Sequence, residues 1–386
     1  MKAIENLPAE KIDLASLRGI AVVKLDHIGD LLLATPVFEA LRQHCPQARI
    51  TAVVGSWSQE VLRNNPFVDE VITYDAPWLD RSRVFDLPKH LGNRASVARL
   101  MSTPYDLVIN LRSDHSNVLF ASLISSRYLL SYQNDTCFQS LITHACDRTP
   151  GQHALSQHVQ LLAQIGVEVT GVPRLFPTDG DWAWASQVVP ASRVWAALFT
   201  GAGHELKKWP ENNFVELARR LSRMGLSVLV VGAEAEMALA TQLAQEVHAV
   251  NLCGQTSLQQ LACVLAHVHV LVSNDSAPVH IGASVGTSVV VITRPLVKEE
   301  FAPIGKGHVV LSVPTCAAPC LGFDFRVRTH TEMKCRCIHS ITVEEVELAV
   351  YERLLDRHAA GELDRAGQPR PPQARNYSEG HPIPVN

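Results

Sequence analysis

Long apolar segments are missing from this sequence. No continuous run approaches the roughly 18 apolar residues that a membrane-spanning helix needs. The first residues, MKAIENLPAEKIDLASLRG, mix charges with brief apolar pieces and lack the apolar centre of a signal peptide. Together these absences predict a cytoplasmic protein that has no transmembrane segment.

An excess of positive charge is also missing. The chain has 34 Lys and Arg against 38 Asp and Glu, which gives a formal net charge of -4. Proteins whose main partner is nucleic acid usually carry a basic field, so we expect no nucleic-acid partner. Hydrophobic residues make up 47% of the chain, as in globular proteins, and 386 residues exceed one comfortable core. Composition and length therefore predict two globular domains.

The sequence holds no disulfide framework. Its 9 cysteines are odd in number and scattered, which indicates reduced thiols. Four of them cluster late in the chain, namely Cys316, Cys320, Cys335 and Cys337. Neither pair has the C-x2-C spacing that is usual in structural zinc sites. We predict reduced loop cysteines and no metal, with a four-thiolate structural metal site as the alternative.

What the sequence does contain is a repeated alternation of strand and helix patterns. A buried strand is predicted at residues 19–25 and a helix at 31–44, and later strands at 50–54, 71–74 and 105–110. Residues 131–152 are less periodic and predict a loop-rich region. A second series has predicted strands at 194–199, 227–231, 268–273 and 287–292, with helices between them. Such alternation predicts parallel sheets of the α/β class.

A change in composition marks the boundary between the two series. The proline and turn residues of 172–181 predict a linker, so we place the domains at residues 1–175 and 190–345. Two doubly wound domains leave a cleft between them, where ligands commonly bind. A helix with early acidic and late basic residues is expected at 342–357. Residues 358–386 are rich in Pro, Gly, Arg and Gln and predict a disordered tail.

The first polar loop is Asp26-His-Ile-Gly-Asp30, which directly follows the first predicted strand. Gly29 permits close approach of the backbone to a ligand, and Asp30 offers a carboxylate as a general base. Asp is also a preferred N-cap, and capping alone explains an Asp before an apolar helix. Both interpretations remain open from this pattern.

The second polar loop is Thr200-Gly-Ala-Gly-His-Glu-Leu-Lys-Lys-Trp-Pro210. Gly201 and Gly203 follow a strand as in a dinucleotide loop, but the third glycine of that motif is absent. Exposed backbone N–H groups, with Lys207 or Lys208 nearby, suit a diphosphate better. An ordinary loop with solvated lysines is the alternative.

The third polar loop contains Asn274, Asp275 and Ser276, between a predicted strand and a small-residue helix that carries His280. The start of a helix favours an anionic ligand. A plain turn and cap, with a packed histidine, would give the same pattern. All three loops follow the carboxyl end of a predicted strand, the edge at which open α/β sheets bind ligands.

These motifs resemble glycosyltransferase family 9, whose best-known members are the ADP-heptose:lipopolysaccharide heptosyltransferases. The likeness lies in Lys24-Leu-Asp-His-Ile-Gly-Asp30 with Thr35-Pro36, in Asn65-Pro66-Phe-Val-Asp69, in Lys207-Lys-Trp-Pro210, and in Ser273-Asn-Asp-Ser-Ala-Pro-Val-His280. The motifs follow one another in the family's order across about residues 18 to 350. The set is therefore more specific than any single motif.

The resemblance implies a GT-B architecture, in which two Rossmann-like, doubly wound parallel-sheet domains face a central cleft. The acceptor would enter from the first domain, and the second would hold the nucleotide-sugar. Asp30 would be the base that deprotonates the acceptor hydroxyl, Lys207 would contact the donor's phosphate and ribose, and Asp275 would bind sugar hydroxyls. The other expected donor-binding residues are Gly201, Gly203, Asn274, Ser276 and His280, and Gly29 would lie beside the base.

The activity implied by this resemblance is inverting transfer of heptose, or a related sugar, from an ADP-sugar to a lipopolysaccharide core acceptor. We expect it to need no cofactor and no metal ion, with the protein bound peripherally at the inner face of the cytoplasmic membrane. Gly201-Ala-Gly203 and Ala277-Pro278 depart from the family pattern and leave the exact sugar open. Alternatives are a family member acting on another glycan or a protein, a GT-B-like sugar-nucleotide epimerase, and a non-catalytic nucleotide-sugar-binding protein.

Overall fold

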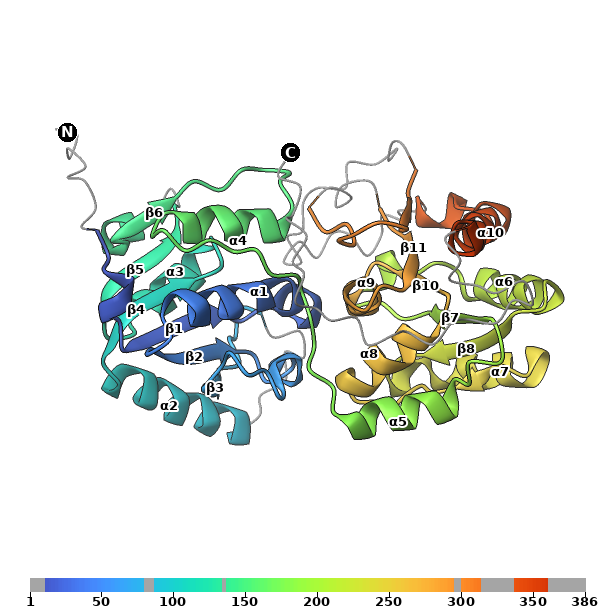
Figure 1. Cartoon of the computed structure of the whole chain (residues 1–386), viewed down its shortest axis with the longest axis horizontal. Helices are drawn as coiled ribbons and strands as arrows, with labels where there is room; N and C mark the ends of the chain where they lie inside the picture. Colours follow the sequence, from blue (N-terminus) through green and yellow to red (C-terminus); the bar gives the residue numbers. More distant parts are fainter. Residues whose placement is uncertain (1–10, 80–86, 134–136, 295–299, 314–336, 360–386) are drawn as a thin grey trace. The chain divides into compact units, whose positions relative to one another are not determined.

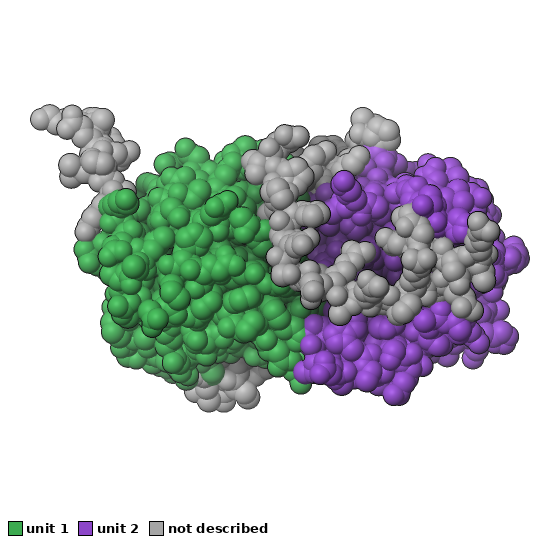
Figure 2. Space-filling view, viewed as in Figure 1, with its two compact units in different colours: residues 1–176, 378–386 green, residues 177–377 purple. Residues whose placement is uncertain are grey.

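The computed structural model describes residues 11–79, 87–133, 137–294, 300–313 and 337–359. The chain divides between Phe176 and Pro177 into two compact units, called unit 1 and unit 2 below (Figures 1 and 2). Among the described helices, none combines the length and apolar character that crossing a bilayer requires.

Unit 1 is built on a parallel sheet in the order β3-β2-β1-β4-β5-β6. Its strands are β1 (Gly19–Lys24), β2 (Arg49–Val54), β3 (Glu70–Thr73), β4 (Tyr105–Asn110), β5 (Ser126–Tyr132) and β6 (His144–Cys146). Neighbouring residues of a strand point to opposite faces, yet Ile20, Ala21, Val22 and Val23 are all fully buried. Both faces of the sheet are therefore covered, as parallel sheets require.

The helices of unit 1 provide that cover. They are α1 (Ile28–His44), α2 (Leu87–Ser102), α3 (His115–Ser122) and α4 (Ala154–Ala163), and Figure 1 shows them around the sheet. Leu100 of α2 and Phe120 of α3 share a core with Ala21 and Val23 of β1. Helices α1 and α4 pack against each other.

Unit 2 repeats this plan with the order β12-β11-β10-β7-β8-β9, again with all strands parallel. Its strands are β7 (Trp195–Phe199), β8 (Ser227–Val231), β9 (Val250–Asn251), β10 (Val270–Asn274), β11 (Ser288–Ile292) and β12 (Val309–Leu311). Numbered within its own unit, each sheet has the order 3-2-1-4-5-6. The order reverses between β1 and β4 and between β7 and β10, and such switch points are the usual ligand sites of this fold.

The helices of unit 2 lie on both faces of its sheet. They are α5 (Asp179–Val188), α6 (Glu211–Arg223), α7 (Met237–Val247), α8 (Leu258–His267), α9 (Ala277–Ser284) and α10 (Val343–Ala359). Side chains of α6, α7 and α10 form one core with Ala196, Val228 and Val272. Helix α9 packs so tightly that a Cβ at Gly282 would lie 3.1 Å from Leu271 Cδ2. The predicted α/β class with two Rossmann-like, doubly wound parallel sheets, the GT-B class, is confirmed.

Residues 131–152 were expected to be loop-rich, and within them lies β6, a three-residue strand too short to give an alternating pattern. Two local predictions were wrong. Asp179-Gly-Asp181 was expected to belong to a linker but forms the first turn of α5, because Thr178 and Asp181 make a capping box there. The predicted tail starts at residue 358, whereas α10 extends to Ala359, and the remainder lies outside the described residues.

Candidate functional site

The first candidate residue, Asp30, lies in the first turn of α1 and is half-buried. The helix begins at Ile28 with His27 at the N-cap position, so the alternative interpretation, in which Asp30 caps the helix, does not hold. Asp30 is instead the third helical residue, directly after Gly29. A carboxylate in the first turn is stabilised in its charged form by the positive end of the helix dipole.

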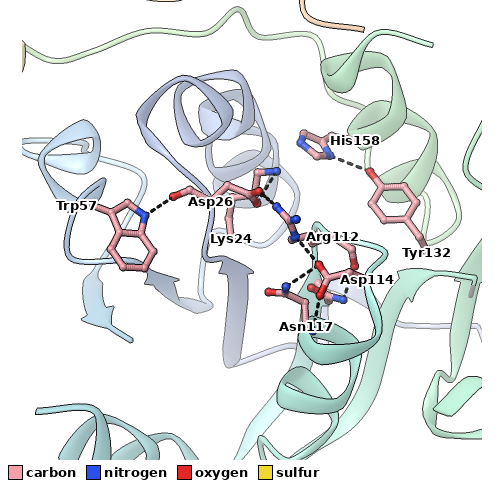
Figure 3. A network of polar contacts seen from close by, with 9 residues as sticks. Lys24, Asp26, Trp57, Arg112, Asp114, Asn117, Tyr132 and His158 are labelled. Carbon is pink, nitrogen blue, oxygen red and sulfur yellow. Dashed lines mark hydrogen bonds and ion pairs between the residues drawn. The ribbon is translucent and has the colours of Figure 1, made fainter. Parts of the chain in front are cut away.

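A buried ionic network lies beside this turn, at the switch point of unit 1 (Figure 3). Lys24 Nζ, at the end of β1, lies 3.0 Å from Asp26 Oδ2. Arg112, two residues beyond β4, donates a hydrogen bond to Asp26 Oδ1 through Nη1 and another to Asp114 through Nε. Lys24 and Asp26 are each only 6% exposed. Asp26 is thus enclosed by two cations.

The charges of this network set the protonation of its members. Burial alone would raise the pKa of Asp26, but Lys24 and Arg112 outweigh it and lower that pKa from 3.8 to about 2. Burial would lower the pKa of Arg112, but Asp26, Asp114 and, more weakly, Asp30 raise it. Asp26 is therefore charged at neutral pH, and Asp30 lies within electrostatic reach of Arg112.

Tyr132 and His158 form a second polar pair near the same edge. The Tyr132 hydroxyl lies 2.8 Å from His158 Nδ1, and the histidine is 3% exposed. Burial, together with the nearby charge of Lys24, holds the pKa of His158 well below 6.5. His158 is therefore neutral at pH 7, and its role is one of packing and hydrogen bonding.

The loop between β1 and α1 is also held through its backbone. Trp57 Nε1 donates a hydrogen bond of 2.9 Å to the Asp26 carbonyl, and the His27 ring centroid lies 5.8 Å from that of Trp57. A Cβ at Gly55 would lie 2.3 Å from the Trp57 ring, so only glycine permits this placement of the indole. The position of Asp26 is thus fixed by both its side chain and its main chain.

In unit 2, the glycine loop after β7 is clamped by Asn274 at the end of β10. Asn274 Nδ2 donates to the carbonyls of Thr200 at 2.8 Å and Gly201 at 3.2 Å, and Oδ1 accepts from the Trp209 N–H at 2.9 Å. The asparagine is fully buried. Because all these bonds go to the loop backbone, Asn274 shapes the loop, whose following residues include Gly203.

Lys207 and Asp275 meet at the switch point of unit 2. Lys207 Nζ lies 2.8 Å from Asp275 Oδ2, and both side chains are largely buried. Lys208 instead pairs with Glu205, whose side chain is 82% exposed. The structure thus distinguishes the two lysines that the loop pattern alone left equivalent, and it brings Lys207 next to the predicted sugar-binding carboxylate.

Helix α9 begins at Ala277, two residues after Asp275. Ser276 is its N-cap and is half-buried, and in this described segment its hydroxyl makes no capping bond to the first turn. Pro278 occupies the second helical position, where a missing N–H costs little. His280, one turn into the helix, is 7% exposed. The helix start and the Gly201–Gly203 loop therefore flank the Lys207–Asp275 pair.

Three residues near these sites were missed by the sequence analysis. Asp26 and Arg112 each lie two residues beyond the end of a strand. The candidate residues of the three polar loops were identified by the same kind of position, after the carboxyl end of a strand. Glu236 binds the Ala233 N–H at 2.8 Å, and a Cβ at Gly201 would lie 2.5 Å from its Oε1. Its carboxylate therefore touches the glycine loop, a contact that sequence spacing gives no means of finding.

Two family motifs have structural functions. The Thr35 hydroxyl accepts a hydrogen bond of 3.1 Å from the Arg174 N–H, and Asn65 Oδ1 accepts one of 3.0 Å from the Phe67 N–H. Arg174 also pairs with Glu39 at 2.5 Å. The two contacts of Arg174 hold the last segment of unit 1 against α1, whereas the Asn65 bond is local to its own loop.

The late cysteines lie almost entirely beyond the described residues. Cys316, Cys320 and Cys335 are outside them, and Cys337 is half-buried before the short helix Ile338–Ser340. Within the described ranges, no group of three or more His, Cys, Asp or Glu side chains is arranged to hold a metal ion.

Known proteins are similar to this chain in sequence and in fold. Residues 94–327 match the family model "Glycosyltransferase family 9 (heptosyltransferase)". The lipooligosaccharide heptosyltransferase 2 of Haemophilus ducreyi is 22% identical over 321 residues, which cover 76% of this chain and 88% of that protein. A glycosyl transferase family 9 structure from Veillonella parvula has a TM-score of 0.74 at 22% identity and covers 90% of this chain and 99% of its own.

A second structure, the E. coli heptosyltransferase WaaC with ADP-2-deoxy-2-fluoro heptose, has a TM-score of 0.65 at 21% identity. It covers 86% of this chain and 99% of that chain. At these identities the structural likeness establishes the fold, while the family match spans more than half of the sequence. The chain belongs to glycosyltransferase family 9, and it is a glycosyltransferase.

Proposed function

We propose that this protein transfers heptose, or a related sugar, from an ADP-sugar to a lipopolysaccharide core acceptor, with inversion and with Asp30 as the general base. The observation that carries the proposal is the contrast between two carboxylates that follow β1, Asp26 in the loop and Asp30 in the first turn of α1. Asp26 is buried and bound by Lys24 and Arg112, whereas Asp30 is half-buried at the start of α1. We assign the base role to Asp30 because its carboxylate is less buried than that of Asp26, which two cations enclose.

Donor binding is assigned to unit 2. The Lys207–Asp275 pair offers a cation for phosphate and a carboxylate for sugar hydroxyls at one point. The Gly201–Gly203 loop and the start of α9 add backbone N–H groups, and Ser276 adds a hydroxyl, in the setting that suits a diphosphate. Asn274 and His280 support these groups from buried positions.

The chemistry needs one base and a stabilised leaving group. The acceptor oxygen forms a bond to the anomeric carbon, the bond from that carbon to the diphosphate oxygen breaks, and Asp30 takes the hydroxyl proton. Lys207 and the backbone donors of unit 2 stabilise the negative charge on the departing ADP. We propose that no divalent metal is needed, and unchanged turnover of purified protein in EDTA would be the expected result.

The acceptor assignment rests on the relatives. The proteins that this chain matches include heptosyltransferases of lipopolysaccharide and lipooligosaccharide. A lipid-linked acceptor implies peripheral association with the inner face of the cytoplasmic membrane. Flotation with vesicles that contain heptose-deficient lipopolysaccharide, compared with vesicles of phospholipid alone, measures that association.

Transfer assays with the full chain test the proposed function. ADP-heptose and heptose-deficient lipopolysaccharide should give a heptosylated product together with ADP, and omission of the acceptor should abolish ADP release. ADP-heptose should also raise the melting temperature, because a ligand that binds only the folded state stabilises it.

Other results would select other functions. Conversion of a UDP-sugar without acceptor would identify an epimerase, and a stabilising nucleotide-sugar that is never turned over would identify a binding protein. Transfer to another glycan, or to a protein, would keep the enzyme class and change the acceptor.

A further inference from the structure

Arg112 bridges the two loops that form the switch point of unit 1. It lies two residues beyond β4, and Asp26 lies two residues beyond β1, in strands that pair directly through Val23 and Asn110. Figure 3 shows the guanidinium between Asp26 and Asp114. No role in the proposed reaction has so far been given to this arginine.

Each end of the bridge is anchored to a helix. Asp114 caps α3: its Oδ1 accepts from the Asn117 N–H at 3.1 Å, and its Oδ2 accepts from Asn117 Nδ2 at 2.7 Å. At the other end, Asp26 stands two residues before the first residue of α1. A guanidinium that bridges two carboxylates, with one hydrogen bond to each, therefore fixes the start of α1 relative to the start of α3.

We propose that Arg112 is a positioning residue for Asp30: by holding Asp26 against Asp114, it fixes the direction of the first turn of α1 and thus the place of the catalytic carboxylate. This inference rests on the function proposed above, in which Asp30 is the base. A displacement of about 1 Å at a reacting group can cost about a hundredfold in rate, so a rigid anchor beside the base has a direct kinetic effect.

An alternative role, binding an acidic group of the acceptor, is disfavoured by the charges around Arg112. Asp26, Asp114 and Asp30 all act on this guanidinium. The cations of the network are Lys24 and Arg112, so three carboxylates face two positive groups. An incoming carboxylate or phosphate would meet a cluster with an excess of negative charge.

The test is a double-variant cycle in the full chain, with ADP-heptose as donor and heptose-deficient lipopolysaccharide as acceptor. Arg112→Gln should lower kcat at least about tenfold and leave both KM values within about threefold, because geometry at the base is lost and binding is not. In an Asp30→Asn background the same substitution should change the residual single-turnover rate by less than about twofold. A purely structural defect would lower the transfer rate by the same factor in the wild-type background and in the Asp30→Asn background.

Arg49→Gln is the matched control. Arg49 pairs with Glu70 at 3.1 Å, but it lies at the amino end of β2, the edge opposite the site, and its side chain is 63% exposed. Its kcat should equal that of the wild type. If Arg112→Gln does not yield folded protein by circular dichroism, Arg112→Lys carries the test. It keeps the charge but loses the guanidinium fork, and kcat should fall at least about threefold with unchanged KM.

Three results would overturn the inference alone: a wild-type kcat in the folded Arg112 variant, equal losses in both backgrounds, or a rise confined to the acceptor KM. The last would assign Arg112 to anion binding. Near-normal turnover of Asp30→Asn would instead overturn the proposed function, and this inference with it.

Discussion

Units 1 and 2 share one strand order but carry different chemistry at the switch point. In unit 1 the loops after β1 and β4 hold the charged side chains of Asp26, Arg112 and Asp114, and Asp30 follows in the first turn of α1. In unit 2 the loops after β7 and β10 hold glycines, a buried amide and two ion pairs, of which Lys207–Asp275 is the largely buried one. The fold determines where each site lies, and the loop residues determine what each site does.

The two networks are also rigid for different reasons. Unit 1 fixes its loop by charge, through a carboxylate enclosed by Lys24 and Arg112. Unit 2 fixes its loop by neutral hydrogen bonds from Asn274 to the backbone of Thr200 and Gly201. A site that moves a proton gains from nearby charges, whereas a site that binds a diphosphate gains from free backbone donors. This comparison predicts reaction in unit 1 and donor binding in unit 2.

The largest effect expected from this comparison is on turnover. Asp30→Asn should lower kcat at least about a hundredfold, the scale of a lost general base, which is about 2.7 kcal/mol in the activation barrier. Steady-state and single-turnover transfer assays measure it. Asp13→Asn is the control, because Asp13 is an exposed cap of a short helix in the same unit. If turnover of Asp30→Asn stays within about threefold of the wild type, Asp30 is not the general base.

The next effect is a pH dependence of stability, which is expected for the Asp26 ion pairs of unit 1 and not for the neutral Asn274 hydrogen bonds of unit 2. The pKa of Asp26 is lowered from 3.8 to about 2, so the folded state binds fewer protons there than the unfolded state. Its contribution of roughly 2 kcal/mol is present above about pH 4 and is lost as the pH falls towards 2. Acidification should therefore loosen β1 and α1 in the wild type.

Hydrogen exchange at about pH 5 and at about pH 2.5 checks this prediction. Protection of β1 and α1 should fall less on acidification in Asp26→Asn than in the wild type, because the variant has no carboxylate to titrate there. Peptides of β7 and β10 should respond equally in both proteins. Equal losses in β1 and α1 would show that Asp26 does not anchor this loop by its charge.

A smaller effect is expected from the lysines of unit 2. Lys207→Ala should weaken ADP-heptose binding about tenfold, or about 1.4 kcal/mol, because one charge-assisted contact to phosphate is removed. Lys208→Ala is the matched control, since Lys208 pairs with the exposed Glu205. Calorimetry should find its Kd unchanged. If both substitutions weaken ADP-heptose binding equally, Lys207 is not the specific phosphate contact that its pairing with Asp275 suggests.

Much of this comparison could be predicted from the sequence, because β-branched runs followed by polar loops are local patterns. The family and the α/β class were predicted from such patterns and are confirmed. Short strands were missed, since the three residues of β6 depend on their neighbour β5 for their structure. The sequence could not decide whether Asp30 caps the helix, because capping depends on where the chain turns, and Asp26 and Trp57 fix that turn through contacts distant in sequence.

The candidate site shows the same limit. Loop positions were found from their place after strands, but their partners were not. Lys207 and Lys208 are equivalent in sequence, and only the structure gives the first of them Asp275 as its partner. Arg112 could not be identified from the sequence, because it acts by bridging to Asp26, a residue 86 positions away along the chain.

The central claim is that reaction and donor binding are separated between the units. Calorimetric titration of Asp30→Asn with ADP-heptose, on a preparation whose turnover has been measured, tests it most directly. The account predicts a Kd within about threefold of the wild type while kcat falls at least about a hundredfold. A Kd that rises in step with the loss of turnover would contradict it, because Asp30 would then act in binding the donor.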